Sequence, residues 1–307
     1  MAPKFRDDAD ESMSSSVTPP PSLPEDDTTS QPPPSEPAAP APQTQGVAPT
    51  GTTAPASAPS APDNAAGWDE ISDWYQSTYQ ISTDSPHYGP LCPDEAELRL
   101  CGDVKGKRVL ELGCGGGQSA IAFARDGAHV IGIDISEEQI SHARKLAEQE
   151  EVKVEFKVGD LADLAFVQAA SIDLVFSSFA FQYVERFDRL CRSVERVLAH
   201  RGLFVFSHDH PFWDCIDASS GTLTRSYFDE APEDWRWNGD PALPRMRSYH
   251  RTISDITTSL TRAGFELEML LEPEAVNDPA SPWARSYPLE LMRSVPATLI
   301  VRARKAS

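Results

Sequence analysis

The residues best suited to chemistry follow two apolar runs in the middle of the chain. An acid, a cysteine and three alternate glycines close the first run, and an acid and an isoleucine close the second. These residues are Glu111, Gly113, Cys114, Gly115, Gly117, Asp134 and Ile135. Glycines allow a backbone to turn tightly and approach a ligand closely, and an acid after the next strand can accept hydrogen bonds from both hydroxyls of a ribose. The pattern is typical of the half of an α/β domain that binds an adenosine-containing cofactor.

The spacing of the glycines distinguishes two kinds of cofactor. A dinucleotide fingerprint, G-x-G-x-x-G, needs a third glycine where this chain has Gln118. The observed E-x-G-x-G-x-G instead closely resembles the first motif of the class I S-adenosylmethionine-dependent methyltransferases. The resemblance implies that the turn accommodates the methionine part of S-adenosylmethionine, that Glu111 helps to hold its ammonium group, and that Asp134, with Ile135 beside it, binds the ribose. Cys114 is interpreted as a small side chain that fits the turn rather than as a nucleophile.

The same resemblance implies further contacts with the cofactor. Asp160 follows a third apolar run and is expected to bind the adenine amino group, while the backbone amide of Leu161 reaches the ring. Residues 173–180 resemble the fourth-strand motif of the family, which places Ser177 at the methionine end, largely through its backbone. Three aromatic residues that follow either wall the acceptor or belong to the core: Phe179, Phe181 and Tyr183.

Two histidines and an acid follow the apolar run 203–206. Ligands of open α/β sheets bind beyond the carboxyl ends of the strands, so these residues are expected to face the cleft. Histidine titrates near neutral pH, and His208 or His210, backed by Asp209, is the candidate base that removes a proton from an acceptor hydroxyl. Hydrogen bonding to the substrate, a metal pair and loop capping are the alternatives, and no metal site is predicted.

The resemblance predicts an enzyme that methylates a small-molecule acceptor, with oxygen as the favoured atom. Methylation of nitrogen or carbon stays open, as do a nucleotide-dependent oxidoreductase and a non-catalytic protein that binds the cofactor. Residues 177–180 read Ser-Ser-Phe-Ala and lack the Asn/Asp-Pro-Pro-Tyr/Phe motif of amino-methylating DNA enzymes. A formal net charge of −20 makes nucleic acid and anionic membranes unfavourable partners. The oligomeric state is left open.

Strands and helices alternate along the middle of the chain, as in a parallel sheet covered by helices. Strands are expected at 108–112, 130–133, 152–158, 172–177, 203–206, 265–271 and 297–302, and helices at 118–125, 136–149, 182–199 and 251–263. The fold class implied by the resemblance is α/β: a Rossmann-like, seven-stranded, mostly parallel sheet whose last strand is antiparallel, with helices on both faces. A helix at 68–75 is expected to form an N-terminal lid, and residues 209–250 a cap inserted after strand five.

Composition divides the chain at about residue 66. Residues 1–66 hold 15 of the 27 prolines and few large apolar side chains, which predicts a disordered, acidic arm. Residues 67–307 hold all six tryptophans and suit one methyltransferase domain with a cofactor-binding core at 107–206. Five cysteines without C-x-x-C spacing predict neither a disulfide framework nor a zinc site. Without a signal-peptide pattern or a long apolar run, a cytoplasmic protein is expected.

Overall fold

The first helix begins inside the range that composition assigned to the arm. The computed structural model describes residues 61–307 apart from residue 286, so most of the predicted arm lies outside the described residues. Helix α1 (Asn64–Thr78) starts inside the range assigned to that arm, because the Asp63 side chain caps it by accepting a hydrogen bond of 3.0 Å from the Ala65 backbone amide. Within the described ranges, no helix is long and apolar enough to cross a membrane.

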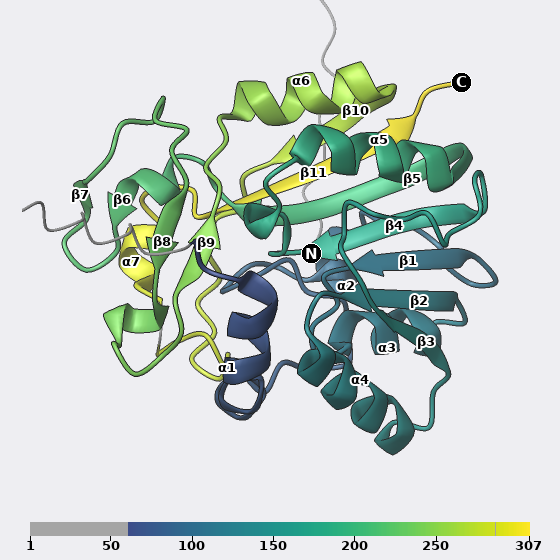
Figure 1. Cartoon of the computed structure of the whole chain (residues 1–307), viewed down its shortest axis with the longest axis horizontal. Coiled ribbons are helices and arrows are strands. Elements are labelled where there is room, and N and C mark those ends of the chain that lie inside the picture. The colour runs from purple at the N-terminus through teal and green to yellow at the C-terminus, as the bar shows by residue number, and fades with distance from the viewer. Residues whose placement is uncertain (1–60, 286) are drawn as a thin grey trace, which may run out of the picture. The chain divides into compact units, whose positions relative to one another are not determined.

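A seven-stranded sheet forms the centre of this domain (Figure 1). Its strands are β1 (Arg108–Leu112), β2 (His129–Asp134), β3 (Val154–Val158), β4 (Ile172–Ser178), β5 (Leu198–Asp209), β10 (Phe265–Leu271) and β11 (Thr298–Lys305). Their spatial order is β10-β11-β5-β4-β1-β2-β3. Strands β1 to β5 run parallel, and β11 runs antiparallel to both of its neighbours. The predicted Rossmann-like sheet with an antiparallel last strand is therefore confirmed.

Helices cover both faces of the sheet, and each face has its own core. The helices are α2 (Glu95–Leu98), α3 (Gln118–Arg125), α4 (Glu137–Gln149), α5 (Phe187–Val197), α6 (Ile253–Ala263) and α7 (Leu289–Met292). Phe204 and Phe206 of β5 join the core under α5 and α6. Leu203 and Val205 point the other way, into the core that holds α3 and α4. This alternation is the period of two expected of a strand buried on both faces.

The predicted cap contains two short hairpins, and helix α1 packs against one of them. Strand β6 (Ile216–Asp217) pairs with β7 (Thr222–Leu223), and β8 (Glu233–Trp235) pairs with β9 (Met246–Ser248). The Asn64 side chain donates a hydrogen bond to the Arg247 carbonyl at 2.9 Å and accepts one from its amide at 2.8 Å. A Cβ on Gly67 would lie 2.6 Å from Met246 Sδ, so the helix and β9 are in close contact. The lid and the cap thus form one continuous roof, which we call the α1–β9 roof.

Two elements differ from the sequence prediction in ways that affect the site. The helix predicted at 182–199 is split into a 3₁₀ turn, η1 (Phe181–Tyr183), and α5. In the break between them, the guanidinium of Arg251 donates hydrogen bonds to the carbonyl oxygens of Val184 and Glu185. Strand β5 continues beyond the predicted 203–206, because it pairs with β11 as far as Asp209.

Candidate cofactor and acceptor site

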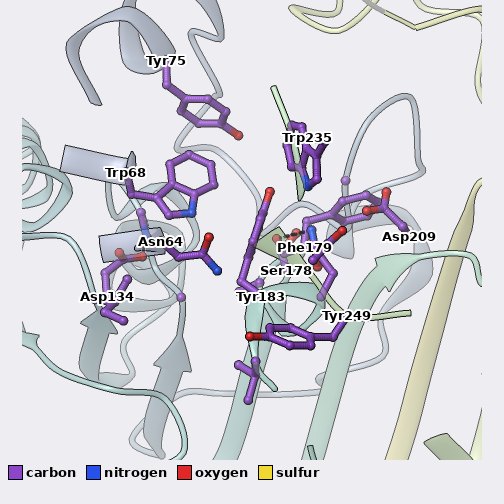
Figure 2. Close-up of a pocket in the computed structure, with 18 of the residues that line it drawn as sticks. Asn64, Trp68, Tyr75, Asp134, Ser178, Phe179, Tyr183, Asp209, Trp235 and Tyr249 are labelled. Atoms are coloured by element: carbon purple, nitrogen blue, oxygen red, sulfur yellow. Dashed lines mark hydrogen bonds between the residues drawn. The ribbon is translucent and has the colours of Figure 1, made fainter. Parts of the chain in front are cut away.

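A cavity of about 950 Å³ lies at the carboxyl ends of β1, β2, β4 and β5 (Figure 2). Its floor is made by the ends of these strands and by the glycine turn after β1, and the α1–β9 roof contributes to its walls. Figure 2 shows Asp134 and Asp209 on opposite sides of Tyr183. We call the part around residues 111–118 and Asp134 the glycine-turn half, and the part around Asp209 the Asp209 half.

The glycine turn has the backbone that its sequence predicts. Gly113, Gly115 and Gly117 have φ angles of +71°, +51° and +82°, in the left-handed region that favours glycine. A Cβ on Gly113 would lie 2.2 Å from the Ala180 Cβ, so the segment after β4 packs directly on the turn. Gly117 does not line the cavity, and a Cβ there would lie 2.8 Å from the Phe156 ring. Its role is close packing at the start of α3, which corrects its assignment as a ligand contact.

Glu111 presents a buried acid to the glycine-turn half. The residue lines the cavity and is only 3% exposed, and its Oε2 has no hydrogen-bond partner among the described residues. Burial raises the pKa of the carboxyl well above its usual range, a hydrogen bond from the Ala120 amide lowers it, and nearby Asp134 raises it further. An unpaired buried carboxyl oxygen is costly. Its position therefore fits a ligand that brings a cationic donor.

Asp134 is held at the end of β2 by the backbone around it. Its Oδ2 accepts a hydrogen bond from the Gly115 amide at 2.8 Å, and its Oδ1 accepts one from the Ser136 amide at 3.0 Å. Burial raises the pKa of this carboxyl, and the amides of Ser136, Gly115 and Ile135 lower it. Each carboxylate oxygen keeps a further lone pair. Ile135 also lines the cavity beside this acid.

Three other predicted residues line the glycine-turn half: Cys114, Asp160 and Leu161. Asp160 is exposed, and its Oδ1 accepts a hydrogen bond of 2.8 Å from the Ala162 amide, which shapes the loop after β3. Cys114 is 5% exposed, and burial raises the pKa of its thiol well above the usual range. A protonated thiol is a poor nucleophile, which agrees with the interpretation of Cys114 as a small side chain of the turn.

Ser177 does not line the cavity, contrary to the expectation for the end of β4. Its side chain is fully buried, and its hydroxyl donates a hydrogen bond of 2.7 Å to the Leu112 carbonyl on β1. Ser178 and Phe179 line the cavity instead. Residues on a strand alternate between its two faces. The contact of Ser177 with the methionine part, largely through its backbone, stays a prediction.

The structure does not bring the predicted histidine base to the cavity. His208 lies within β5, on the same side as Phe206, with the two rings parallel and their centroids 6.1 Å apart. The Nε2 of His210 pairs with Glu272 Oε1 at 2.8 Å, and its Nδ1 accepts a hydrogen bond from the Phe212 amide at 3.1 Å. Neither histidine is among the residues that line the cavity. The expectation that both face the cleft is wrong, because it assumed a loop where the strand continues.

Asp209 is the member of that group which does line the cavity. Burial raises the pKa of its carboxyl well above the usual range, and neighbouring Asp214 raises it further.

His87 lines the cavity as well, with its Nδ1 3.3 Å from Ser178 Oγ. Burial lowers the pKa of His87 to about 4, although Asp94 raises it, so the ring is uncharged at neutral pH.

Three glutamines connect the lid to the glycine turn, and the sequence analysis missed this connection. Gln76 of α1 donates a hydrogen bond to Gln139 Oε1 at 2.7 Å and accepts one from the Gln118 amide at 2.8 Å. A Cβ on Gly116 would lie 2.6 Å from the Gln76 amide, so the side chain rests on the turn. Gln118 was considered only as the residue that replaces a dinucleotide glycine. No local pattern marks Gln76, because its partners lie more than 40 positions away.

Comparison with known proteins agrees with this geometry. Residues 109–202 match the model of a methyltransferase domain. A crystal structure of an S-adenosylmethionine-dependent methyltransferase from Mesorhizobium loti is 30% identical in sequence, covers 68% of this chain and 95% of its own, and has a TM-score of 0.57. An uncharacterized protein of Haemophilus influenzae is 30% identical over 223 residues, which are 68% of this chain and 85% of that protein.

A third similarity covers about a third of the chain. The ubiquinone biosynthesis O-methyltransferase of Bordetella avium is 34% identical over 108 residues, 35% of this chain and 45% of that protein. The match therefore spans less than half of that relative.

The fold and the glycine turn define an S-adenosylmethionine-binding transferase. The chain belongs to the class I S-adenosylmethionine-dependent methyltransferases, as its motifs predicted. The glycine-turn half fits this cofactor on three counts. The unpaired Glu111 oxygen suits an ammonium group, Asp134 suits a pair of hydroxyls, and Gly115 leaves space, since a Cβ there would meet only Gln139 Oε1, at 3.9 Å.

Proposed function

We propose that this methyltransferase transfers a methyl group to an oxygen atom of a small-molecule acceptor bound in the Asp209 half. The observation that carries the proposal is the continuity of the cavity, which passes from the glycine turn, beyond the end of β4, to Asp209 at the end of β5. Its volume of about 950 Å³ lies within the usual size of a small-molecule site. The side chains of the α1–β9 roof that line it favour an enclosed small molecule over a polymer.

In this proposal the glycine-turn half holds the cofactor. Glu111 binds the ammonium group and Asp134 binds the ribose hydroxyls. Asp160 and the Leu161 amide bind the adenine. Cys114, Gly115 and Ile135 contact the ligand through their backbone or small surface. These roles rest on the unpaired oxygen of Glu111, on the backbone bonds that fix Asp134 and on the lining of the cavity.

The bound cofactor supplies a methyl carbon that its sulfonium already activates. The protein therefore has to align the acceptor and exclude water, which is an entropic and steric task. The α1–β9 roof excludes water in this proposal. His87 is positioned to accept a hydrogen bond from an acceptor hydroxyl, because its ring is uncharged at neutral pH and lies beside Ser178 at the end of β4.

One observation favours oxygen over nitrogen or carbon as the methylated atom, namely the similarity of about a third of the chain to ubiquinone biosynthesis O-methyltransferases. The net charge of −20 disfavours nucleic acid as a partner. A cytoplasmic location and the division into an arm and a single domain remain part of this proposal.

The test is to incubate the full chain with S-adenosylmethionine and a panel of small phenols, enols and amines, and to measure S-adenosylhomocysteine and methylated product by mass spectrometry. We expect products that carry one added methyl group, and fragmentation should place that group on oxygen. Methyl groups found only on nitrogen or carbon would overturn the choice of atom. Turnover confined to protein or nucleic-acid substrates would overturn the choice of acceptor class.

A further inference from the structure

Six aromatic rings that line the cavity form an arc from Tyr183 to Tyr287. Successive ring centroids lie 6.3 Å apart for Tyr183 and Trp235, 5.3 Å for Trp235 and Trp237, 5.8 Å for Trp237 and Tyr75, 6.4 Å for Tyr75 and Trp283, and 5.9 Å for Trp283 and Tyr287. The rings come from α1, η1, the cap and the segment before α7, four parts of the chain that are distant in sequence. We call this set the aromatic arc.

Asp209 lines the cavity together with Tyr183 and Tyr287, the two terminal rings of the arc. Burial raises the pKa of both phenols, and the charge of Asp209 raises it further. Among the described residues no donor hydrogen-bonds to the Asp209 carboxyl group and no basic side chain pairs with it. The charged neighbour that acts on it is another acid, Asp214.

A second unpaired acceptor belongs to Gln182, the residue before Tyr183 of the aromatic arc. Gln182 lines the cavity and is 8% exposed, and its Nε2 donates a hydrogen bond of 2.9 Å to the Phe179 carbonyl. That bond fixes the orientation of the amide and leaves Oε1 on the other side. Gln182 Oε1 is buried and has no hydrogen-bond partner among the described residues. Buried polar atoms without partners are rare in folded proteins and call for a ligand or a bound water.

A carboxyl group, an amide oxygen and an arc of π faces all attract the same chemical group. An alkylammonium brings a positive charge and several N–H donors, and aromatic faces bind cations by their quadrupole. An anionic group would be repelled by the carboxylate, and a neutral hydroxyl or amide could donate a hydrogen bond but would bring no charge for the carboxylate or the aromatic faces. We propose that the acceptor carries a cationic amine, bound by Asp209 and Gln182 within the aromatic arc. This inference rests on the proposed function, because it assumes that the acceptor binds in the Asp209 half.

The amine is an anchor and not the methylated atom. Asp209 is the last residue of β5 and Glu111 belongs to β1, with β4 between them. The register aligns Glu111 with Phe176 and Phe176 with Val205, so Asp209 lies four residues beyond the level of Glu111. Two strand spacings of about 4.8 Å and four rises of about 3.3 Å separate the two backbone positions by roughly 16 Å. The acceptor must therefore extend from the amine towards β4, and a hydroxylated arylalkylamine is an extended cation with the flat ring that an aromatic wall favours.

The experiment compares three phenols of similar size that differ in charge. Tyramine is a cation, 4-ethylphenol is neutral and 4-hydroxyphenylacetate is an anion. Each is titrated by calorimetry into the full chain saturated with S-adenosylhomocysteine. We expect tyramine to bind at least about tenfold more tightly than 4-ethylphenol, and the anion to bind most weakly. In Asp209→Asn the preference for tyramine should fall to about twofold or less.

Glu185→Gln is the matched control, because Glu185 is an exposed acid on the rim of the same cavity and the substitution removes the same charge. It should retain the preference for tyramine. A preference that survives Asp209→Asn, equal binding of the three phenols, or no binding of any at about 10 mM would overturn the proposal. Thermal midpoints of both variants verify that they are folded. Methylation of an amine nitrogen would overturn the proposed oxygen chemistry while leaving the cation site standing, so the two failures are distinguishable.

Discussion

Replacing Glu111 by Gln should weaken cofactor binding while it stabilises the ligand-free protein. The substitution keeps an oxygen for the Ala120 amide, removes the charge and places an NH2 group where Oε2 faces the ligand. Losing a charge-assisted bond to the cofactor's ammonium costs about 1.5–3 kcal/mol, which is roughly a 10- to 150-fold higher Kd for S-adenosylmethionine. Without ligand, the unpaired carboxyl is itself a cost, because burial raises its pKa well above the usual 4.5.

The sign of the pH effect follows from that raised pKa. The folded protein holds the Glu111 proton at pH values where the unfolded chain has lost it, so this group makes stability fall as pH rises above about 4.5. The variant has no carboxyl group at this position, so its stability should not decrease with pH in this way. Near pH 8 its free energy of unfolding should exceed that of the wild type by about 1 kcal/mol or more, which corresponds to roughly 2–4 °C in Tm.

Calorimetry with S-adenosylmethionine and S-adenosylhomocysteine measures the first effect, and thermal unfolding from pH 5 to pH 8.5 measures the second. Glu155→Gln, an exposed acid on β3, should change neither quantity. An unchanged Kd in Glu111→Gln would refute the assignment of the ammonium site. A Tm several degrees lower than that of the wild type at pH 8 would refute the claim that the ligand-free carboxyl is unsatisfied.

Three further predictions concern the turn, the ribose site and a histidine. Asp134→Ala should weaken cofactor binding by about 1.5–3 kcal/mol in calorimetry, through the lost ribose contacts and the released Gly115 amide, and full affinity would contradict the ribose assignment. Gly113→Ala should lower Tm by several degrees more than Gly102→Ala. Both glycines have positive φ, which costs about 1–2 kcal/mol for alanine, but only Gly113 also meets a neighbouring atom, at 2.2 Å. Equal decreases in Tm would show that the backbone around Gly113 shifts enough to accommodate the added methyl group. The free energy of unfolding of the wild type should decrease as pH falls from 6 to 4, and His208→Phe should make this decrease smaller by about 1 kcal/mol per pH unit. Burial holds the pKa of His208 at about 3, so the unfolded chain binds that proton first as pH falls. Parallel pH curves for the variant and the wild type would contradict the shift.

A local sequence pattern predicted that Glu111, Gly113, Gly115 and Asp134 lie together, and all four line the cavity. Glu111, the glycines and Asp134 lie on consecutive strand ends, so a pattern within 25 residues places them together. The architecture of the sheet was predicted from the resemblance of these motifs to the family.

The other half of the cavity could not be predicted in that way. Its rings lie at positions as far apart as Tyr75 and Tyr287, and their contacts depend on how the roof closes. The length of β5 could not be predicted either, because its pairing with β11 joins residues about 90 positions apart. The length of this strand determines whether His208 or Asp209 faces the cavity. Because successive side chains of a strand point to opposite faces, an error of one residue reverses which side chains are assigned to the cavity.

The position of Asp63 and Asn64 has a practical consequence for shortening the protein. A chain trimmed at the composition change, to begin at residue 67, would lack the cap of α1 and the side chain that bonds to the Arg247 backbone. The first turn of the remaining helix would fray, and the α1–β9 roof would lose its hydrogen bonds to Asn64. Weak ligand binding by such a fragment would then result from the truncation and would not disprove the site. A start at or before residue 61 keeps both contacts, so the boundary for expression should follow the first hydrogen bond and not the last proline-rich segment.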